Sequence, residues 1–184
     1  MLDPANIHFR PLQRADLPLL YSWHLAPHVH QWWDPPASLE ALVERFNRQQ
    51  SSQEPPYRFI ILYASQPIGS IQYFPIRSWQ DYQAAIQIEE EAAGVDMFIG
   101  DPTYLHQRLG GPILRQFLQE IVFADKTLIS CIIGPEPENH SAIRAYEKAG
   151  FRHLKTVPIP FLNETCYLMR LARSEAPYTD RPCC

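Results

Sequence analysis

The sequence contains no long hydrophobic run and no surplus of positive charge. No segment of its 184 residues reaches the roughly 18 uninterrupted apolar residues of a membrane-spanning helix. The first residues, MLDPANIHFR, lack the basic and then apolar pattern of a secretion signal. The net charge is −4 and the isoelectric point is near 6.0, whereas proteins that coat nucleic acid normally carry a basic surplus. These absences predict a cytosolic protein with no membrane or nucleic-acid partner, and they favour cationic over anionic partners.

Cysteine is scarce and has no metal-binding or redox spacing. Two of the four cysteines, Cys131 and Cys166, lie in apolar strand-like runs, and the other two end the chain. His28 and His30 form a pair without a nearby third ligand. The sequence therefore predicts neither a disulfide framework nor a metal site.

Hydrophobic periodicity predicts an α+β fold with alternating elements. We expect strands over residues 7–12, 57–64, 68–75, 95–99, 127–133, 152–157 and 164–171. We expect helices over 16–23, from a Ser38 cap through 39–46, from near Pro112 to 122, and over 139–149. Residues 28–36 read as an irregular connection, and the acidic stretch 76–94 reads as a surface loop or ragged strand. This order predicts one α/β layered domain over residues 1–172, with a flexible tail over 173–184.

The segment from Asn139 to Phe151, NHSAIRAYEKAGF, is the most informative part of the chain. Tyr146 follows Asn139 by seven residues, which is two helical turns, so both side chains can face one ligand. The simpler interpretation is an amphipathic helix that directs Ala142, Ile143, Tyr146 and Ala149 to the core and stops at Gly150.

A second pattern lies upstream, where residues 105–111 read LHQRLGG and lead directly into a predicted helix. A loop that enters a helix in this way presents backbone N–H groups to an anion such as a pyrophosphate. Taken alone, the same residues also fit a simple glycine-containing turn. Together with the later motif, they indicate a site for a phosphate-bearing cofactor.

The two motifs resemble those of the GNAT family of acyl-CoA-dependent N-acyltransferases. The resemblance implies a mixed central sheet of about six to seven strands, flanked by helices on both faces, and acetyl-CoA as acyl donor with no metal. It implies that Asn139 holds the pantetheine arm and that Tyr146 protonates the departing thiolate. A backbone N–H of the strand 95–99 would polarise the thioester carbonyl. The implied cofactor-binding residues are Phe98, Leu105, Gln107, Arg108, Leu109, Gly110, Gly111, Asn139 and Ala142.

Arg108 departs from the family pattern. The family loop is written R/Q-x-x-G-x-G/A, and Arg108 stands where its first glycine is usual. The arginine either obstructs close approach of the backbone or pairs with a cofactor phosphate. Both outcomes stay open at the level of sequence.

Within the family, the region from Phe9 to Met169 is similar to the aminoglycoside 6′-N-acetyltransferases, a branch that also includes siderophore lysine N-acyltransferases. The likeness is most specific from Ile68 onward. It implies that Asp96 binds the acceptor amine and accepts its proton, where siderophore enzymes typically carry a histidine. The implied acceptor-binding residues are Trp33, Gln72, Asp81, Asp96 and Glu136.

Gly134 replaces an acidic residue that both kinds of relative commonly carry, and Glu136 or Glu138 is the candidate to compensate. The sequence thus predicts an acetyltransferase for a small cationic amine, most simply the 6′-amine of an aminoglycoside, acting as a monomer or homodimer. Two alternatives remain. One is acylation of a siderophore precursor of the N-hydroxylysine type or of another small amine, and the other is an acyl-CoA-binding module without turnover.

Overall fold

A computed structural model of the protein describes residues 2–52 and 54–176. The chain folds into two compact units. Unit 1 comprises residues 1–74 and 96–107, and unit 2 comprises residues 75–95 and 108–184. Seven strands form a mixed sheet in the order β1-β2-β3-β4-β5-β7-β6, in which β4 (Ala92–Ile99) contributes residues to both units. The predicted layered fold with a mixed sheet is confirmed.

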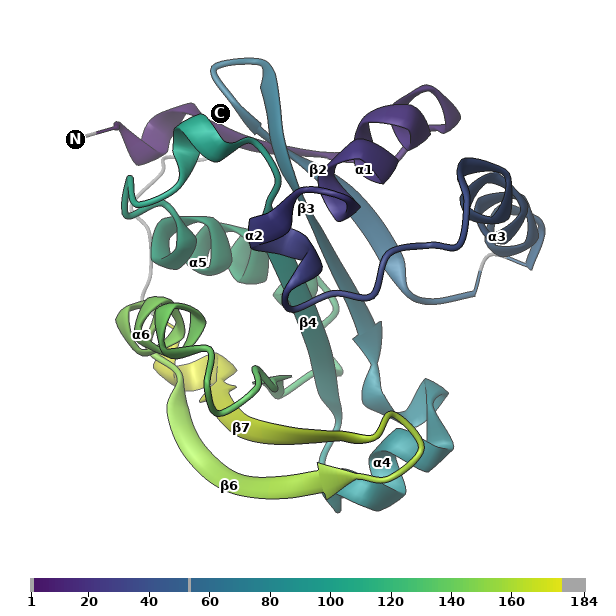
Figure 1. The fold of residues 1–184 in the computed structure, drawn as a ribbon. Coiled ribbons are helices and arrows are strands. Elements are labelled where there is room, and N and C mark those ends of the chain that lie inside the picture. Colours follow the sequence, from purple (N-terminus) through teal and green to yellow (C-terminus); the bar gives the residue numbers. More distant parts are fainter. Residues whose placement is uncertain (1, 53, 177–184) are drawn as a thin grey trace. The chain divides into compact units, whose positions relative to one another are not determined.

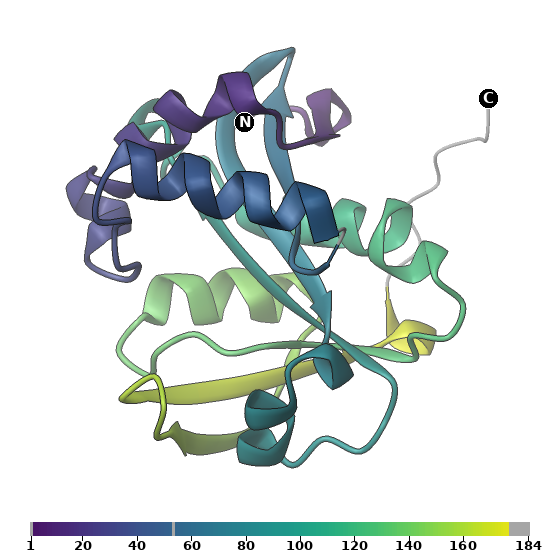
Figure 2. The ribbon, with the colours of Figure 1, turned by 90° about the vertical axis from the view of Figure 1, so that its right-hand side faces the viewer.

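Unit 1 is built on an antiparallel meander of β1 (Ile7–Pro11), β2 (Tyr57–Tyr63) and β3 (Gln66–Pro75). The predicted hairpin is therefore present. The helices of this unit are α1 (Leu17–His24), α2 (Pro27–His30) and α3 (Leu39–Ser52). Helices α1 and α3 pack against each other, and Figure 2 shows them beside the β2–β3 hairpin. The core between these elements consists of Leu12, Leu17, Leu20, Trp23, Leu42 and Ile60.

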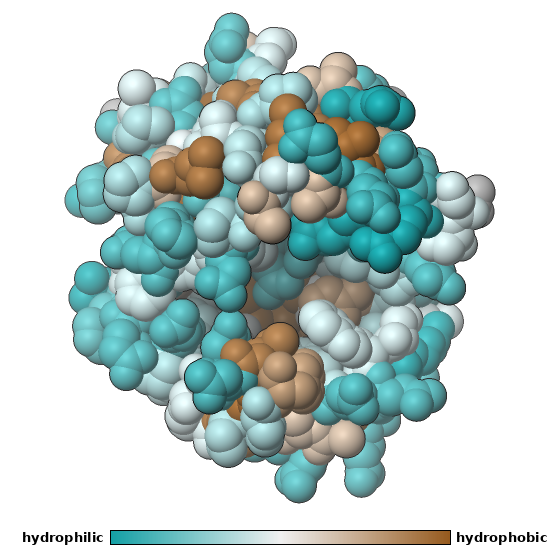
Figure 3. Space-filling model, turned by 45° about the vertical axis from the view of Figure 1, so that its right-hand side comes forward, coloured by the Kyte–Doolittle hydropathy of each residue, from teal (hydrophilic) through white to brown (hydrophobic). Residues whose placement is uncertain are grey.

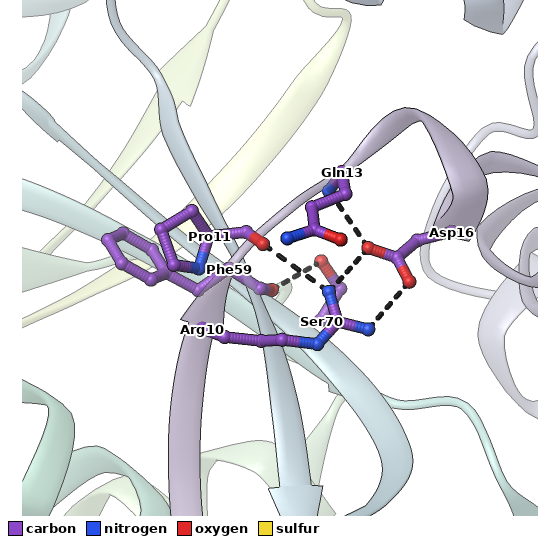
Figure 4. A network of polar contacts seen from close by, with 6 residues as sticks. All are labelled: Arg10, Pro11, Gln13, Asp16, Phe59 and Ser70. Carbon is purple, nitrogen blue, oxygen red and sulfur yellow. Dashed lines mark hydrogen bonds and ion pairs between the residues drawn. The ribbon is translucent and has the colours of Figure 1, made fainter.

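The start of α1 is tied to β1 by an ion pair (Figure 4). Arg10 donates two hydrogen bonds to the carboxylate of Asp16, at 2.6 and 2.7 Å. The same carboxylate accepts the backbone N–H of Gln13 at 2.8 Å. Asp16 is almost fully buried, and the bonds from Arg10 hold the pKa of its carboxyl below the ordinary value. On the neighbouring strands, the Ser70 hydroxyl donates to the carbonyl oxygen of Phe59 at 3.2 Å.

Unit 2 combines a parallel strand pair with a long hairpin. The beginning of β4 runs parallel to β5 (Ser130–Ile133), which pairs antiparallel with β7 (Glu164–Ala172), and β7 pairs with β6 (Arg152–Ile159). The helices are α4 (Gln80–Ile86), α5 (Gly110–Glu120) and α6 (His140–Ala149). Helices α5 and α6 pack side by side (Figure 1). Short 3-10 helices in the two units cover Pro4–Asn6, Arg14–Asp16, Ile76–Ser78, Pro102–Tyr104, Val122–Ala124 and Arg173–Glu175.

The prediction for residues 76–94 was wrong in its main part. Helix α4 occupies the middle of this stretch, and β4 begins at Ala92, three residues before the predicted start. Tyr82 and Ile86, one helical turn apart, are the buried side of α4. With only two apolar anchors among polar and acidic residues, the helical period of this short segment was too weak to detect.

Smaller corrections concern the ends of other elements. Residues 28–36 were predicted to be irregular, but the first of them belong to α2, which Pro27 begins. Strand β5 begins at Ser130 rather than at residue 127, because Asp125 accepts bonds from the backbone and hydroxyl of Thr127 and forms a turn there. Of the predicted tail, Arg173–Glu175 is a 3-10 helix. Residues 177–184, which include Cys183 and Cys184, lie outside the described part of the chain.

Over the ranges 2–52 and 54–176, the structure contains no helix with the length and apolarity needed to cross a membrane. Figure 3 shows one face of the molecule, on which hydrophilic residues predominate and hydrophobic residues form separate groups.

Candidate active site

Two of the predicted acceptor residues of unit 1, Gln72 and Asp96, are joined by a direct hydrogen bond. Asp96 lies on β4, and the side-chain amide of Gln72 on β3 donates to its Oδ2 atom at 2.9 Å. The Asp96 side chain is half-buried. Burial raises the pKa of this carboxyl, while the bond from Gln72 and the positive charge of Arg58 act to lower it, and the net shift is upward. A carboxylate with a raised pKa is a better proton acceptor than an exposed aspartate.

The same unit also contains a group of aromatic rings, formed by Trp33, Phe98 and His24. The rings of Trp33 and Phe98 are 5.3 Å apart between centroids and nearly perpendicular. His24 on α1 contacts both rings, at 5.2 Å from Phe98 and 6.2 Å from Trp33. The structure therefore brings together Trp33, predicted to bind the acceptor, and Phe98, predicted to bind the cofactor.

Trp23 belongs to the core and borders this aromatic group. It is 6% exposed and packs edge-to-face on Phe98. A side chain at Gly100 would collide with its ring, since an added Cβ would lie 2.3 Å from two of the indole carbons. The absence of a side chain at Gly100 thus lets Trp23 pack directly on the backbone that follows β4.

In unit 2, the predicted pyrophosphate loop leads into a helix whose first turn has no side-chain cap. Helix α5 begins at Gly110, two residues before the predicted start, and Leu109 precedes it without a capping hydrogen bond. Leu109 is 2% exposed and belongs to the core. An added Cβ on Gly110 would lie 3.1 Å from the Cβ atom of Ala145 on α6. The glycine thus permits close packing of the two helices. The uncapped helix start leaves backbone N–H groups that can bind an anion, which is what the predicted pyrophosphate site requires.

Arg108 has the backbone conformation that glycine adopts most easily. Its φ angle is 62°, and that of His106 is 60°. Residues with a Cβ atom occupy this left-handed region at a cost of roughly 1–2 kcal/mol. The side chain of Arg108 is exposed. The backbone conformation explains why the family usually has a glycine at this position, and Arg108 adopts the same conformation. The exposed guanidinium of Arg108 is compatible with the predicted contact to a phosphate.

The remaining residues of the predicted loop belong to unit 1. Leu105 is half-buried, and its backbone N–H donates to the carbonyl oxygen of Pro102 at 3.2 Å. Gln107 is exposed.

Helix α6 combines the two interpretations of the Asn139 to Phe151 motif. Asn139 caps the helix, because its Oδ1 atom accepts the backbone N–H of Ala142 at 3.1 Å. Gly150 ends the helix with a φ angle of 106°. Tyr146 is 8% exposed. The cap uses the amide oxygen of Asn139, so the NH2 group of this side chain is the part that can serve a ligand.

Three further positions concern the predicted acceptor site in unit 2. Asp81 is exposed in the first turn of α4, where a negative charge also favours the helix. Glu136 is half-buried, and its carbonyl oxygen accepts the backbone N–H of Asn139 at 3.0 Å. At Gly134, an added Cβ would lie 3.0 Å from Cδ2 of Leu168 and 3.3 Å from Cβ of Cys166. The acidic residue of relatives would therefore require a shift of β7 side chains in this protein.

Two residues that contact the predicted site residues of unit 1, Arg58 and His24, were not predicted from the sequence. Arg58 on β2 donates to the Oε1 atom of Gln72, and His24 contacts the predicted aromatic residues. An isolated arginine in an apolar strand was an available signal for Arg58, because a charged residue there usually has a partner. No cluster of histidine, cysteine or acidic residues suited to a metal ion occurs in the part of the chain that the structure describes.

Comparisons with known proteins identify the family of this chain. Residues 13–159 match the sequence model of the acetyltransferase (GNAT) domain. The chain belongs to the GNAT acetyltransferase family, whose acyl donor is acetyl-CoA, and the predicted reaction class is thereby confirmed.

Among its relatives is the aminoglycoside N(6′)-acetyltransferase type 1 of Klebsiella pneumoniae, which is 28% identical over 158 residues, covering 84% of this chain and 78% of that protein. A kanamycin resistance protein of Rhizobium radiobacter is 33% identical over 88 residues, covering 45% of this chain and 81% of that protein. The crystal structure of the aminoglycoside acetyltransferase AAC(6′)-Ib in complex with coenzyme A and kanamycin superimposes with a TM-score of 0.80. It is 27% identical, covering 92% of this chain and 96% of the other.

Proposed function

We propose that this GNAT enzyme transfers the acetyl group of acetyl-CoA to the 6′-amine of an aminoglycoside. The observation that carries the proposal is the half-buried carboxylate of Asp96, held by Gln72 on the neighbouring strand. A recessed anion with a raised pKa both attracts a cationic amine and accepts its proton. The relatives named as aminoglycoside N(6′)-acetyltransferases support this choice of acceptor.

The reaction assigns one proton transfer to each of two residues. The amine nitrogen attacks the thioester carbonyl as its proton passes to Asp96, directly or through water. A C–N bond forms and the C–S bond breaks. The departing thiolate then receives a proton from the hydroxyl of Tyr146. Asn139 would hold the pantetheine arm through its NH2 group, and the start of α5 would bind the pyrophosphate.

Two other functions use the same family features. Acylation of a siderophore precursor of the N-hydroxylysine type, or of another small amine, is the alternative within the same chemistry, and Asp96 favours the aminoglycoside over it. A non-catalytic acyl-CoA-binding module is the alternative from another class. Tyr146 favours an enzyme, since a module that only binds acyl-CoA has no need for a proton donor at sulfur.

The proposal also includes the extent of the domain, its location in the cell and its oligomeric state. We propose that residues 1–172 act as one acyltransferase domain, since the family match over residues 13–159 includes parts of both units. The domain would act in the cytosol as a monomer or homodimer.

The deciding experiment measures the release of free thiol from acetyl-CoA with a panel of amines. The panel contains aminoglycosides with a 6′-amine, aminoglycosides with a 6′-hydroxyl, linear polyamines, N-hydroxylysine and lysine peptides. We expect rapid turnover only with the 6′-amine compounds. Turnover that prefers N-hydroxylysine would replace the proposal with the siderophore function. Tight binding of acetyl-CoA without turnover of any amine would indicate the non-catalytic module.

A further inference from the structure

Three strands of unit 1 contribute polar side chains to one continuous chain of hydrogen bonds. Arg58 and Gln72 are direct cross-strand partners on β2 and β3. The Nε atom of Arg58 donates to Oε1 of Gln72 at 2.9 Å, and Gln72 donates to Asp96 on β4 at 2.9 Å. On the other side, the NH1 group of Arg58 donates to Oε1 of Gln49 on α3 at 2.5 Å. The carboxylate of Asp96 is thus connected to helix α3 through the side chains of Gln72 and Arg58.

The chemistry of arginine determines which group donates and which accepts in each of these hydrogen bonds. A guanidinium only donates hydrogen bonds, so the amide oxygen of Gln72 must face Arg58. The NH2 group of Gln72 must then face Asp96. A donor in this position requires an accepting oxygen, which favours the ionised carboxylate and fixes its rotation. Arg58 therefore determines the orientation of Gln72, and Gln72 determines that of Asp96.

We propose that Arg58 is a positioning residue for the acetyltransfer reaction, acting through Gln72 to hold Asp96 ionised and correctly oriented for the acceptor amine. This inference rests on the proposed role of Asp96 in accepting the proton of the amine. It assigns to Gln72 a contact with Asp96 as its primary role, in place of the direct contact with the acceptor that the resemblance implied.

The charges around Asp96 are consistent with this assignment. Burial lowers the pKa of Arg58 to about 10, so its guanidinium remains positive at neutral pH. His24 on α1 has a pKa lowered to about 4, first by burial and then by the charges of Arg45 and Arg58, so it is neutral under the same conditions. Arg45 on α3 acts on His24 and Arg58. Of the described residues, Arg58 is the charged group that lowers the pKa of Asp96.

A groove beside Arg58 provides a way to test the assignment chemically. The groove has a volume of about 300 Å³, and its lining includes Phe46, Gln49, Gln50, Tyr57 and Arg58. In an Arg58→Ala variant, the space of the missing guanidinium would open to this groove. A small guanidinium ion from solution can then occupy the position and restore the donor to Gln72.

The experiment compares the pH profile of kcat/KM for the wild type, Arg58→Ala, Arg58→Lys and Arg45→Ala. Activity requires ionised Asp96 and falls as the pH drops through its pKa. Loss of the Arg58 charge raises that pKa, so we expect the acidic limb of Arg58→Ala to move to higher pH and kcat/KM to fall about 10- to 100-fold. Arg58→Lys keeps the positive charge but loses the planar guanidinium group. The acidic limb of its pH profile should therefore stay near that of the wild type. Arg45→Ala is the matched control and should leave the limb unmoved.

Guanidinium chloride at low, non-denaturing concentration should restore activity to Arg58→Ala and leave Arg45→Ala unchanged. A loss of folding would lower the height of the profile without moving its acidic limb and without recovery by guanidinium. An unmoved limb in Arg58→Ala, with no response to guanidinium, would overturn the proposal.

The inference and the proposed function fail in different ways. If Asp96→Asn keeps full turnover, the role of Asp96 is wrong, whatever Arg58 does. If Asp96→Asn is inactive while Arg58→Ala behaves as the wild type, the proposed function stands and the inference fails. Should no amine be acetylated, the pKa of Asp96 measured by NMR in the wild type and in Arg58→Ala still tests the link. An equal pKa in both proteins would reject it.

Discussion

The side-chain oxygen of Asn139 caps helix α6 by accepting the backbone N–H of Ala142 at 3.1 Å. This bond gives the residue a structural role that is separable from its predicted contact with pantetheine. Asn139→Ala removes both functions, and the lost cap should lower the free energy of unfolding by about 1 kcal/mol. Asn139→Asp keeps an accepting oxygen but loses the NH2 donor.

We therefore expect Asn139→Asp to unfold at nearly the same urea concentration as the wild type while its Kd for acetyl-CoA rises. Urea denaturation and isothermal titration calorimetry measure the two quantities independently. Equal acetyl-CoA affinity in wild type and Asn139→Asp would mean that the residue serves only as a helix cap.

Tyr146→Phe tests the proton donor. The change removes one hydroxyl from a residue whose ring is almost buried and packs near Phe151, so the fold should be retained. Loss of a general acid should reduce kcat about 100-fold or more, with little change in acetyl-CoA affinity. Stopped-flow thiol release gives kcat, and equilibrium binding gives the affinity. A variant with unchanged kcat would remove Tyr146 from the chemical step.

Asp96→Asn should lower acceptor turnover strongly and leave acetyl-CoA binding nearly unchanged, since the carboxylate serves the amine. A loss of acetyl-CoA affinity as large as the loss of turnover would contradict the assignment of Asp96 to the acceptor.

The same variant has an expected effect on stability. The folded-state pKa of Asp96 is raised above its ordinary value of 3.8, chiefly by burial. A raised pKa stabilises the fold at low pH, and this contribution is lost as the pH rises through the folded-state value. Asp96→Asn should therefore be more stable than the wild type at neutral pH. Urea denaturation across the pH range should show the advantage shrinking as the pH approaches 3.8. A variant less stable than the wild type at neutral pH would contradict the predicted sign.

The Arg10–Asp16 pair predicts a pH dependence of opposite sign. Its hydrogen bonds lower the folded-state pKa of Asp16 below 3.8, so the stabilisation is present above that value and is lost as the pH falls through the folded-state pKa. Asp16→Asn should lower the free energy of unfolding at neutral pH by about 1–3 kcal/mol. The matched control is the Arg77–Glu91 pair, in which both side chains are about half exposed. Glu91→Gln should change stability by less than about 1 kcal/mol. Equal effects of the two substitutions in thermal or urea denaturation would refute the importance of burial at Asp16.

Arg108 permits a test of charge against backbone strain. Arg108→Gly removes the guanidinium but suits the φ angle of 62°, whereas Arg108→Lys keeps a charge at the same strained position. If Arg108 binds a cofactor phosphate, KM for acetyl-CoA should rise in Arg108→Gly and rise less in Arg108→Lys. The difference should diminish at high ionic strength because salt screens exposed charges. Unchanged KM in both variants would show that the position serves only the turn.

Many elements of the fold were predictable because their signals are local. The helix start at Ser38, the β2–β3 hairpin and the stop of α6 at Gly150 each depend on residues within a few positions of one another. Helix α4 was not predictable in this way, because it has only two buried anchors, Tyr82 and Ile86. Its formation depends on packing against parts of the chain that are distant in sequence.

The features of the candidate site also differ in whether the sequence alone could identify them. The Asn139 and Tyr146 spacing and the glycine-bearing loop could be recognised from the order of residues, since helical spacing and motif composition are properties of short segments. Asp96 was chosen from the resemblance to the aminoglycoside enzymes. The connection of Gln49 to Arg58, Gln72 and Asp96 could not be recognised from the order of residues. These four residues come from one helix and three strands, and they meet because β2 and β3 pair in a register that places Arg58 opposite Gln72. Strand register is set by the burial of whole sheet faces, which no short segment of this sequence contains.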